Sequence, residues 1–417
     1  MKIDYRTHIE ERLLPFWERA FDREYGGVFT CFDNRGETLA SRDKYVWSQG
    51  RVVWLLGRLL PMIRKGRIEA DESLYRDQLE RSGHFLIKNA FLETGSVAWL
   101  LEQDGAVKTE PNEPADKSIY ADCFVVIGLA QGGATLNRSD WIDRACSLYD
   151  SIVERIESGT YRTDPYPIPE AYEAHSIPMI LLNVAQTLAD ALGEVKRKDE
   201  SEAYQEAAVE WMEQILSRFL RPDGRILEMR STPDAQQNTL LGRHVNPGHA
   251  LESIWFILDT ARNTGRDELI PKASRAALYA LERGWDKIHG GIYRFVDESG
   301  YDPIGDKIGT PMESLILETW STKLWWPHSE ALYTTRLLWT LTGEPHFREW
   351  LNRLESYVFS TFPHPDPTVG EWIQIRNRQG EPLEKVVALP VKDPFHILRN
   401  MICILDLLDQ QVHESKP

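Results

Sequence analysis

One short segment recurs six times along the chain at a long and nearly constant spacing. It combines an acidic residue, one or two glycines, a short alternating stretch and a polar turn, as in DREYGGVFTCFDNRGE from Asp22 and DKIHGGIYRFVDESG from Asp286. Successive anchoring glycines are 68, 64, 65, 67 and 79 residues apart. These glycines are Gly27, Gly95, Gly159, Gly224, Gly291 and Gly370. A repeated period of this length is typical of a repeat architecture.

Between the glycine segments the periodicity is helical. From Ile142 to Ile156, apolar residues recur at i, i+3, i+4 and i+7, which predicts an outer helix with one buried face. The stretch KYVWSQGRVVWLLGRLL from Lys44 is apolar nearly all round, as expected of a helix buried between two layers. The glycine segment predicts a strand over residues 28–32, because side-chain character alternates there and the turn sequence 34–36 (NRG) follows.

These units predict a ring of helix pairs. Two helices of about 15–20 residues plus a hairpin loop account for a period of about 65 residues. Six such units can close into an (α/α)6 barrel; an open superhelix and two unrelated helical domains are the alternatives. We favour closure, because neither end of the chain carries a polar capping repeat. The prediction is one all-α domain over residues 1–417, an (α/α)6 barrel of helix-hairpin-helix repeats with short β-hairpins on one rim.

The net charge and the number of cysteines limit which binding partners and which cellular compartment are expected for this protein. The chain has 48 Lys and Arg against 64 Asp and Glu, a formal net charge of −16, which argues against a nucleic acid or an anionic membrane as partner. Its four cysteines form no C-x-x-C pair and are too few for a disulfide framework. The opening MKIDYRTHIEERLL lacks the apolar core of a signal peptide, and no apolar run approaches the roughly 20 residues of a membrane span. We therefore expect a reduced, cytoplasmic protein.

The chemically interesting residues share one phase of the repeat. Counted from the glycine of their unit, four of them lie 24 to 27 residues later: Arg51, Asp122, His249 and His396. Two deviate, since His175 follows its glycine by 16 residues and His328 by 37. In a repeat protein equal phase means equal height, so we expect these residues to surround one mouth of the barrel. Each would lie near the start of an inner helix, where free N–H groups and the helix dipole favour sugar oxygens or an oxyanion.

Local motifs around these positions support a site. In NPGHALE, a turn precedes a helix that places His249 and Glu252 on one face. In KYVWSQGR, Trp47 lies one turn from Arg51, which sets an aromatic ring beside a cation. A lone histidine at a helix start is more often a cap or a core residue, and LWWPHSEA could be core, but the shared phase and the turn context favour functional roles.

Other chemistries leave no motif. The sequence contains no G-x-x-x-x-G-K-[ST] loop, no H-E-x-x-H and no G-x-S-x-G. His175, His249 and His396 could bind a metal, but the sequence near them contains no cysteines or paired carboxylates at the spacing of metal ligands. We therefore predict no metal and no cofactor.

Five ordered motifs resemble the N-acylglucosamine 2-epimerase family, which also contains cellobiose 2-epimerases and aldose–ketose isomerases. They are FWERAFDREYGGVFTCFDNRGE, KYVWSQGR, GRHVNPGHALE, KLWWPHSEA and DPFHILR. The resemblance implies the (α/α)6 barrel, and many relatives are dimers. It implies acid/base roles for His249 and His396, with enolate-stabilising and sugar-binding roles at Arg51, Glu252, Trp326 and Glu330.

The resemblance leaves the branch of the family open. KYVWSQGR, NPGH and WWPHSE look closest to the N-acetylhexosamine 2-epimerases, whereas His175 in EAHSIPMILLN looks like the extra histidine of the neutral-sugar enzymes. Asp122 stands where many relatives carry Glu. The first hypothesis is a 2-epimerase of N-acetylglucosamine and N-acetylmannosamine. The alternatives are a neutral-sugar isomerase or epimerase and a non-catalytic sugar-binding module. The expected substrate contacts are Trp47, Asp122, His175, Glu252, Trp326, His328 and Glu330, beside the catalytic set His249, His396 and Arg51.

Overall fold

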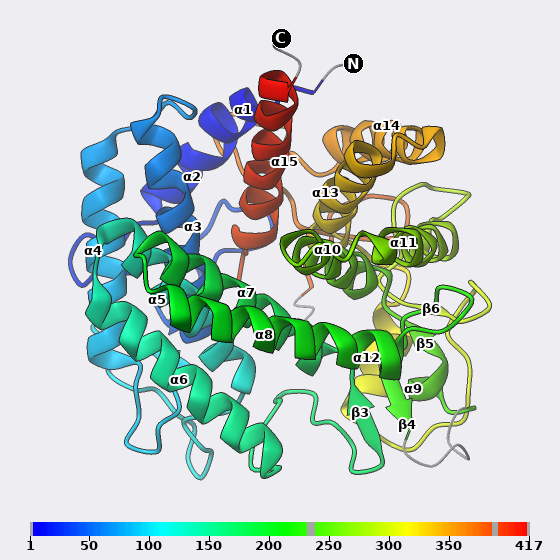
Figure 1. Cartoon of the computed structure of the whole chain (residues 1–417), viewed down its shortest axis with the longest axis horizontal. Helices are drawn as coiled ribbons and strands as arrows, with labels where there is room; N and C mark the ends of the chain where they lie inside the picture. The colour runs from blue at the N-terminus through cyan, green and yellow to red at the C-terminus, as the bar shows by residue number, and fades with distance from the viewer. Residues whose placement is uncertain (1–2, 232–237, 386–390, 415–417) are drawn as a thin grey trace.

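The computed structural model describes residues 3–231, 238–385 and 391–414, and in them two concentric rings of helices form the molecule (Figure 1). The inner ring consists of α3 (Val46–Arg64), α5 (Ile119–Leu136), α7 (Ser176–Glu194), α10 (Pro247–Asn263), α13 (Trp325–Thr342) and α15 (Phe395–Glu414). The outer ring contains α4 (Glu72–Asn89), α6 (Ser139–Glu157), α8 (Lys198–Gln214), α11 (Ile270–Gly284) and α14 (Pro345–Thr361). The sixth outer member is α1 (Tyr5–His8) and α2 (Leu14–Arg19), joined by a π-helical turn.

The ring closes through its first and last elements. Helix α15 packs against α3, and α1 packs against α15, so the two ends of the chain meet, as the top of Figure 1 shows. Tyr5 donates a hydrogen bond to Glu355 of α14 (2.8 Å), and Arg12 donates to the carbonyl of His364 (2.7 Å). The predicted (α/α)6 barrel is confirmed. An open superhelix would leave the α3 and α15 faces apart.

Burial follows the predicted helical patterns. Helix α6 buries one stripe, which includes Trp141, Ile142, Leu148 and Ile152, and leaves its other face exposed. Helix α5 is buried on nearly every face, because it lies between the barrel interior and the outer ring. This explains why a chain with an ordinary apolar content contains helices without a polar side.

The expectation that no segment is long and apolar enough for a membrane span needs correction. Helices α5 and α7 both reach that length and hydropathy. In this fold they are inner-ring helices, with 78% and 67% of the relevant windows buried inside the protein. Burial in a helical core demands the same apolar composition as a bilayer does.

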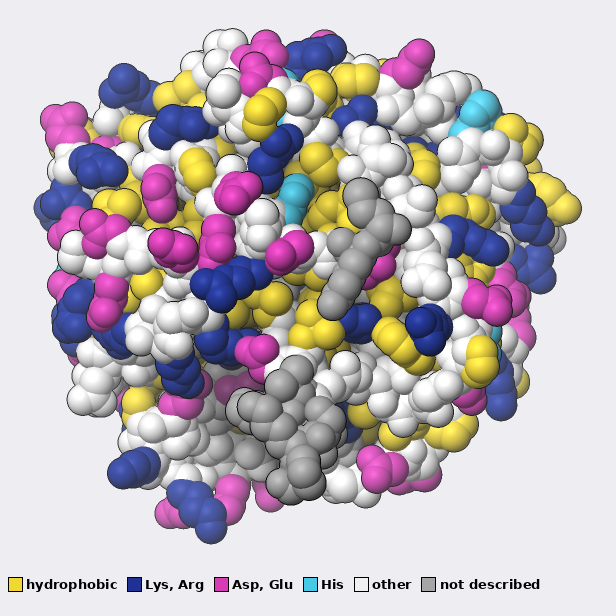
Figure 2. Space-filling view, turned by 90° about the horizontal axis from the view of Figure 1, so that it is seen from above, with side chains coloured by type: hydrophobic (Ala, Val, Ile, Leu, Met, Phe, Trp, Pro, Cys, Tyr) yellow, Lys and Arg dark blue, Asp and Glu magenta, His cyan; other side chains and the backbone are white. Residues whose placement is uncertain are grey.

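On the outside of the protein, acidic and basic side chains are interspersed over the face shown in Figure 2.

The glycines of the repeat are required by backbone conformation. All six anchoring glycines have φ between 68° and 99°, a region that other residues adopt only with strain. Phe21 pairs with Val28 across the turn that contains Gly27, and Phe32 pairs with Leu39; both pairs are isolated bridges. The predicted continuous strand over 28–32 is therefore wrong, although the turn at 34–36 forms.

The regular strands form four two-stranded sheets, each of which joins two loops that follow one another along the chain. The pairs are β1 (Lys44–Tyr45) with β2 (Leu100–Leu101), β3 (Tyr172–Ala174) with β4 (Met229–Ser231), β5 (His244–Val245) with β6 (Val296–Asp297), and β7 (Lys323–Leu324) with β8 (Ile375–Arg376). All are antiparallel, with Lys44 opposite Leu101 and Lys323 opposite Arg376. The first strand of each pair leads into an inner helix at once or after one residue, so these ladders hold the helix starts together at one rim. The short helices α9 (Leu240–Arg243) and α12 (Pro311–Thr319) lie in loops of the same region, at the lower right of Figure 1.

Buried lysines attach the hairpins to this rim. Lys44 donates to Asp22 (2.7 Å) and to the carbonyl of Gly26, and Lys323 donates to Asp286 (3.2 Å). Asp22 and Asp286 are the acidic residues that recur before the glycines. Because each is buried and paired, the acidic residue serves the fold in these two units.

Candidate active site

In the first turns of the inner helices, side chains at two positions point in opposite directions and have different roles. At the sixth helical position, Arg51, Glu252, Glu330 and Asn400 point to the barrel centre, where Glu330 meets Asn400 and Arg399 bridges Glu252 and Glu330. At the fourth position, Gln49, Asp122 and His328 point away and accept hydrogen bonds from backbone N–H groups of the hairpins. Two residues correspond to about 200° of helical rotation, which explains the opposite directions.

His249 is held at the start of α10. Asn246 caps the helix by accepting from the backbone N–H of His249, and Pro247 occupies the first turn. The ring Nδ1 lies 2.7 Å from Oε1 of the buried Glu228. Burial alone lowers the pKa of His249, but the charge and hydrogen bond of Glu228 outweigh it and raise that pKa above its ordinary value. No described residue bonds Nε2 of His249, so this nitrogen is available to a substrate.

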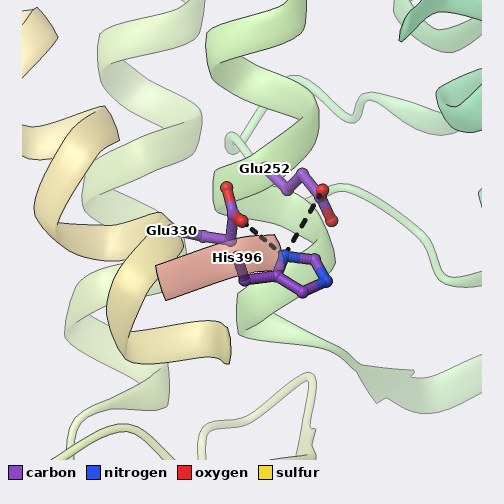
Figure 3. A group of neighbouring side chains, drawn as sticks. All are labelled: Glu252, Glu330 and His396. Carbon is purple, nitrogen blue, oxygen red and sulfur yellow. Dashed lines mark hydrogen bonds and ion pairs between the residues drawn. The ribbon is translucent and has the colours of Figure 1, made fainter. Parts of the chain in front are cut away.

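His396 is held by a second carboxylate. Its Nδ1 lies 2.6 Å from Oε1 of Glu330 and 3.8 Å from Oε1 of Glu252, as the dashed lines in Figure 3 show. Because a carboxylate only accepts, Nδ1 carries the proton. Nε2 lies 3.4 Å from Nη2 of Arg51, which only donates. These contacts favour the tautomer with the proton on Nδ1, in which the Nε2 lone pair is turned to the Arg51 cation.

The two glutamates are brought together by a buried arginine. Nη2 of Arg399 contacts Glu252 and lies 2.6 Å from Oε1 of Glu330. Trp255 donates to the other oxygen of Glu330 (2.7 Å). Burial opposes ionisation of Glu330, yet Arg399 and the hydrogen bonds lower its pKa to about 2. Ligand atoms of Glu252, Glu330 and His396 lie within 4.8 Å of one another, a spacing that suits a metal, but the Arg399 guanidinium already supplies the cation there.

Arg51 is fixed by aromatic rings and one carboxylate. Its guanidinium carbon lies 4.6 Å from the Trp47 ring centroid, 4.0 Å from that of Phe124 and 5.2 Å from that of Phe395. Asp393 forms an ion pair with it at 3.2 Å. Such stacking restricts the plane of the guanidinium, which keeps its N–H groups aimed at one place. The sequence prediction that Trp47 lies beside Arg51 agrees with this geometry.

Both histidines lie beside the ring of Trp326. Its ring centroid is 5.1 Å from that of His249 and 5.7 Å from that of His396, with interplanar angles of 38° and 42°. The half-buried indole offers a flat apolar surface. A sugar that packs on this surface would have both imidazoles close to it.

Two predicted substrate contacts do not fit the structure. Both ring nitrogens of the fully buried His328 are used, since Nε2 accepts from the N–H of Ile292 (2.7 Å) and Nδ1 donates to the carbonyl of Leu324 (2.6 Å). Asp122 accepts from Val97 and pairs with Arg155 of the outer ring (3.0 Å). Both residues therefore join a hairpin to an inner helix. The phase count gave Asp122 a common height with Arg51, His249 and His396, but not the side of the helix to which its side chain points.

His175 reaches the site only indirectly. Its side chain is fully buried, and Nε2 lies 3.1 Å from the Ser253 hydroxyl. Nδ1 lies 3.9 Å from Oε2 of Glu228, whose other oxygen holds His249. His175 therefore lies behind the carboxylate that positions His249, and its direct contact with a substrate stays a prediction.

Two site residues were missed by the sequence argument: Glu228 and Asp393. Arg399 follows His396 by three residues and so shares its helix face, but its bridging role was not predicted. Glu228 lies four residues after its hairpin glycine, where the other units carry Cys31, Trp99, Thr163, Phe295 and Gln374. A single carboxylate among uncharged equivalents was an available signal. Arg399 is visible only through its contacts, because nothing in DPFHILRN distinguishes a buried bridging arginine from a surface one.

The assembled site has a definite chemical capacity. Two imidazoles, each oriented by a buried glutamate, lie beside the Trp326 ring, and a fixed guanidinium lies beside one of them. Such a pair can remove a proton from one face of a carbon and return one to the other, while the cation stabilises the negative charge in between.

Comparison with known proteins gives one consistent result. The sequence profile of a family described as N-acylglucosamine 2-epimerase (GlcNAc 2-epimerase) matches residues 27–399. The N-acylglucosamine 2-epimerase of Bos taurus is 31% identical over 417 residues, 98% of this chain and 91% of that protein. The Homo sapiens protein of the same name is 29% identical over 98% of this chain and 90% of its own. The solved cellobiose 2-epimerase of Spirochaeta thermophila shares the fold, with a TM-score of 0.76 at 15% identity over 98% of this chain and 96% of that one.

Proposed function

The chain belongs to the N-acylglucosamine 2-epimerase family, and from this premise we propose that it is a sugar 2-epimerase that interconverts N-acetylglucosamine and N-acetylmannosamine. The observation that carries the proposal is the pair of glutamate-held histidines that both lie beside Trp326. An inversion at C2 needs one proton-transfer group on each face of that carbon.

The reaction proceeds on the open-chain sugar. Neutral His396 accepts the C2 proton through Nε2, and the electron pair moves into the C1–C2 bond to give an enolate with its charge on O1. His249, whose pKa is raised, then donates a proton to the opposite face of C2 and the carbonyl re-forms. For the other epimer the two histidines exchange roles.

Arg51 stabilises the intermediate. Its guanidinium lies 3.4 Å from Nε2 of His396, beside the proton-accepting nitrogen, so O1 of a bound sugar can reach it. The ring stacking that fixes Arg51 removes the cost of reorienting a cation during the reaction. Because the histidines and Arg51 supply acid, base and counter-charge, we propose a reaction without a cofactor.

The acetamido substrate is favoured over neutral sugars by two points. The relatives that match over nearly the full chain carry the name N-acylglucosamine 2-epimerase. The residue that resembled a neutral-sugar feature, His175, is buried behind Glu228 with Nε2 bonded to Ser253.

Proton exchange in D2O tests the proposal. The protein is incubated with N-acetylglucosamine, N-acetylmannosamine, mannose, fructose and cellobiose, and the products are followed by NMR. We expect deuterium at C2 together with inversion for the acetamido sugars. A ketose product would replace the proposal with an isomerase, inversion of cellobiose alone would replace it with a disaccharide epimerase, and no exchange with any sugar would leave a binding module.

The two histidines provide the internal control. His249→Asn and His396→Asn should each reduce inversion by roughly 100-fold or more, the contribution of one positioned acid or base. Each variant retains one histidine and should still exchange C2 of one epimer without inverting it, with opposite preferences in the two variants. Two folded variants that invert C2 at near-parent rates would contradict the mechanism.

We also propose a cytoplasmic homodimer. All four cysteines are free thiols, two of them buried, which suits a reducing compartment. The dimer rests on the family resemblance alone. Light scattering of the purified protein would give its mass and decide between monomer and dimer.

A further inference from the structure

A second cavity opens at the end of the barrel opposite the candidate active site. Its volume is about 330 Å³, and all six inner helices contribute to its wall. Except for Arg399, its lining residues lie in the middle or toward the carboxyl ends of their helices, whereas His249 and His396 lie in the first turn. In Figure 1 the carboxyl end of α15 lies at the top, and the strands β3 to β6 lie in the lower half.

The cavity wall carries charged groups of both signs. Three arginines and three aspartates line it: Arg58, Arg262, Arg399, Asp190, Asp259 and Asp406. Arg58 and Asp406 form an ion pair at 2.8 Å. Because cationic and acidic groups are mixed around the wall, the ligand that fits it best is neutral with many hydrogen-bonding groups.

Aromatic rings and amides complete the wall. Trp54, Trp255 and Tyr333 come from three different helices and lie among the side-chain amides of Gln131 and Asn183. Flat apolar rings next to hydrogen-bonding groups match a molecule with apolar C–H faces and a rim of hydroxyls. A sugar or an acyclic polyol has this chemistry.

Two carboxyls of the cavity, the exposed Asp190 and the half-buried Asp259, have oxygens that can accept hydrogen bonds from a ligand. Asp190 and Asp259 make no hydrogen bond or ion pair with any residue in the described part of the chain. Burial raises the pKa of Asp259 to about 7, although Arg262 lowers it in part. Hydroxyl groups of a ligand would satisfy both carboxyls.

The cavity and the active site share two residues. Trp255 lines the cavity and donates to Oε2 of Glu330, and Arg399 lines the cavity and lies 2.6 Å from Oε1 of Glu330. Glu330 in turn holds Nδ1 of His396 at 2.6 Å. A displacement of either wall residue therefore changes the hydrogen bonding of the carboxylate that orients His396.

We propose that this cavity is an effector site for a small neutral polyhydroxylated ligand, and that Trp255 and Arg399 transmit its occupancy to His396 through Glu330. The binding step is independent of the proposed function; the transmission step rests on it. The ligand acts without being converted, because no catalytic pair of histidines faces this cavity among the described residues.

D-mannitol is the probe, because it lacks a carbonyl and cannot undergo exchange at C2. The indole N–H signals of ¹⁵N-labelled protein are assigned with Trp54→Phe and Trp255→Phe, and mannitol is titrated. We expect saturable shifts of the Trp54 and Trp255 signals. Shifts confined to Trp47 and Trp326, or no shift at concentrations far above a millimolar dissociation constant, would overturn the site.

Variants locate the binding. Asp190→Asn combined with Asp259→Asn should weaken mannitol binding about tenfold or more, because hydrogen bonds to charged groups are lost. Asp150→Asn, an exposed aspartate of α6, is the matched control and should bind as the parent does. Asn183→Leu provides a second variant if the double one fails to fold. Equal binding in parent and variants would overturn the assignment.

Transmission is read at His396. The imidazole ¹³C signal of His396 is followed against pH with and without saturating mannitol, and we expect its titration midpoint to move. An unmoved midpoint in protein that binds mannitol would overturn the transmission step alone. Protein that binds mannitol but exchanges C2 of no sugar would disprove the proposed function and leave the cavity assignment standing.

Discussion

Three histidine side chains have three different properties in this fold. His249 has a raised pKa beside Glu228, His396 presents a lone pair to Arg51, and burial lowers the pKa of His328 to about 3, so that it only supports a hairpin. The type of residue does not decide among these states. The nearest charge and the number of occupied ring nitrogens do.

Arg51→Lys tests the cation at the residue scale. Lysine keeps the charge but loses the planar fork and the stacking on Trp47 and Phe124. We expect turnover to fall roughly 100- to 1,000-fold, as for the loss of one fixed stabiliser of developing charge. The measurement is kcat at saturating substrate, with circular dichroism as the folding control. Activity within about threefold of the parent would remove Arg51 from the reaction.

Glu228→Gln tests the acid. The substitution removes the charge that raises the pKa of His249, so that pKa falls. Because His249 must be protonated to donate, activity is present below its pKa and is lost as pH rises through it. We expect the alkaline limb of the bell-shaped kcat/KM profile to move to lower pH. An unchanged alkaline limb would show that His249 is not the acid.

At the scale of secondary-structure elements, the close contact between helices α3 and α5 depends on glycine. A Cβ at Gly50 of α3 would overlap the carbonyl oxygen of Phe124 in α5, and a Cβ at Gly128 would overlap the carbonyl oxygen of Gly50. Neither obstacle is the end of a flexible side chain. The two helices can therefore approach only because both positions lack a side chain, and this approach places Phe124 against Arg51.

Gly50→Ala should separate α3 from α5. We expect the free energy of unfolding, measured with urea, to fall by about 1–3 kcal/mol, as for an overpacked core. Gly193→Ala in α7 is the matched control: its Cβ would meet only the Ser201 hydroxyl at 3.4 Å, so the higher helix propensity of alanine should leave stability equal or slightly raised. A Gly50→Ala protein as stable as the control would contradict the close-contact interpretation.

At the scale of the whole molecule, the closed ring predicts one cooperative unit over residues 1–417. Helix α15 packs on α3, and α1 packs on α15, so no segment of the ring has a free end. We expect calorimetry, tryptophan fluorescence and far-ultraviolet circular dichroism to report the same single unfolding transition. Two separated transitions would show that part of the ring unfolds on its own.

The sequence alone determined the architecture, because its signals are local and repeated. Helical periodicity and the glycines with positive φ depend on residues within one unit, and six such units leave few ways to bury their apolar faces. The same count gave His249, His396 and Arg51 a common height at the mouth. Only the tertiary structure decided which residues face the centre, since a count of residues along the chain gives height but not the rotation that separates Glu330 from His328. It also brought Glu228 to His249 and Arg399 to Glu252, because the first pairing depends on how the hairpin folds back onto the start of α10 and the second on how α15 faces α10 across the barrel.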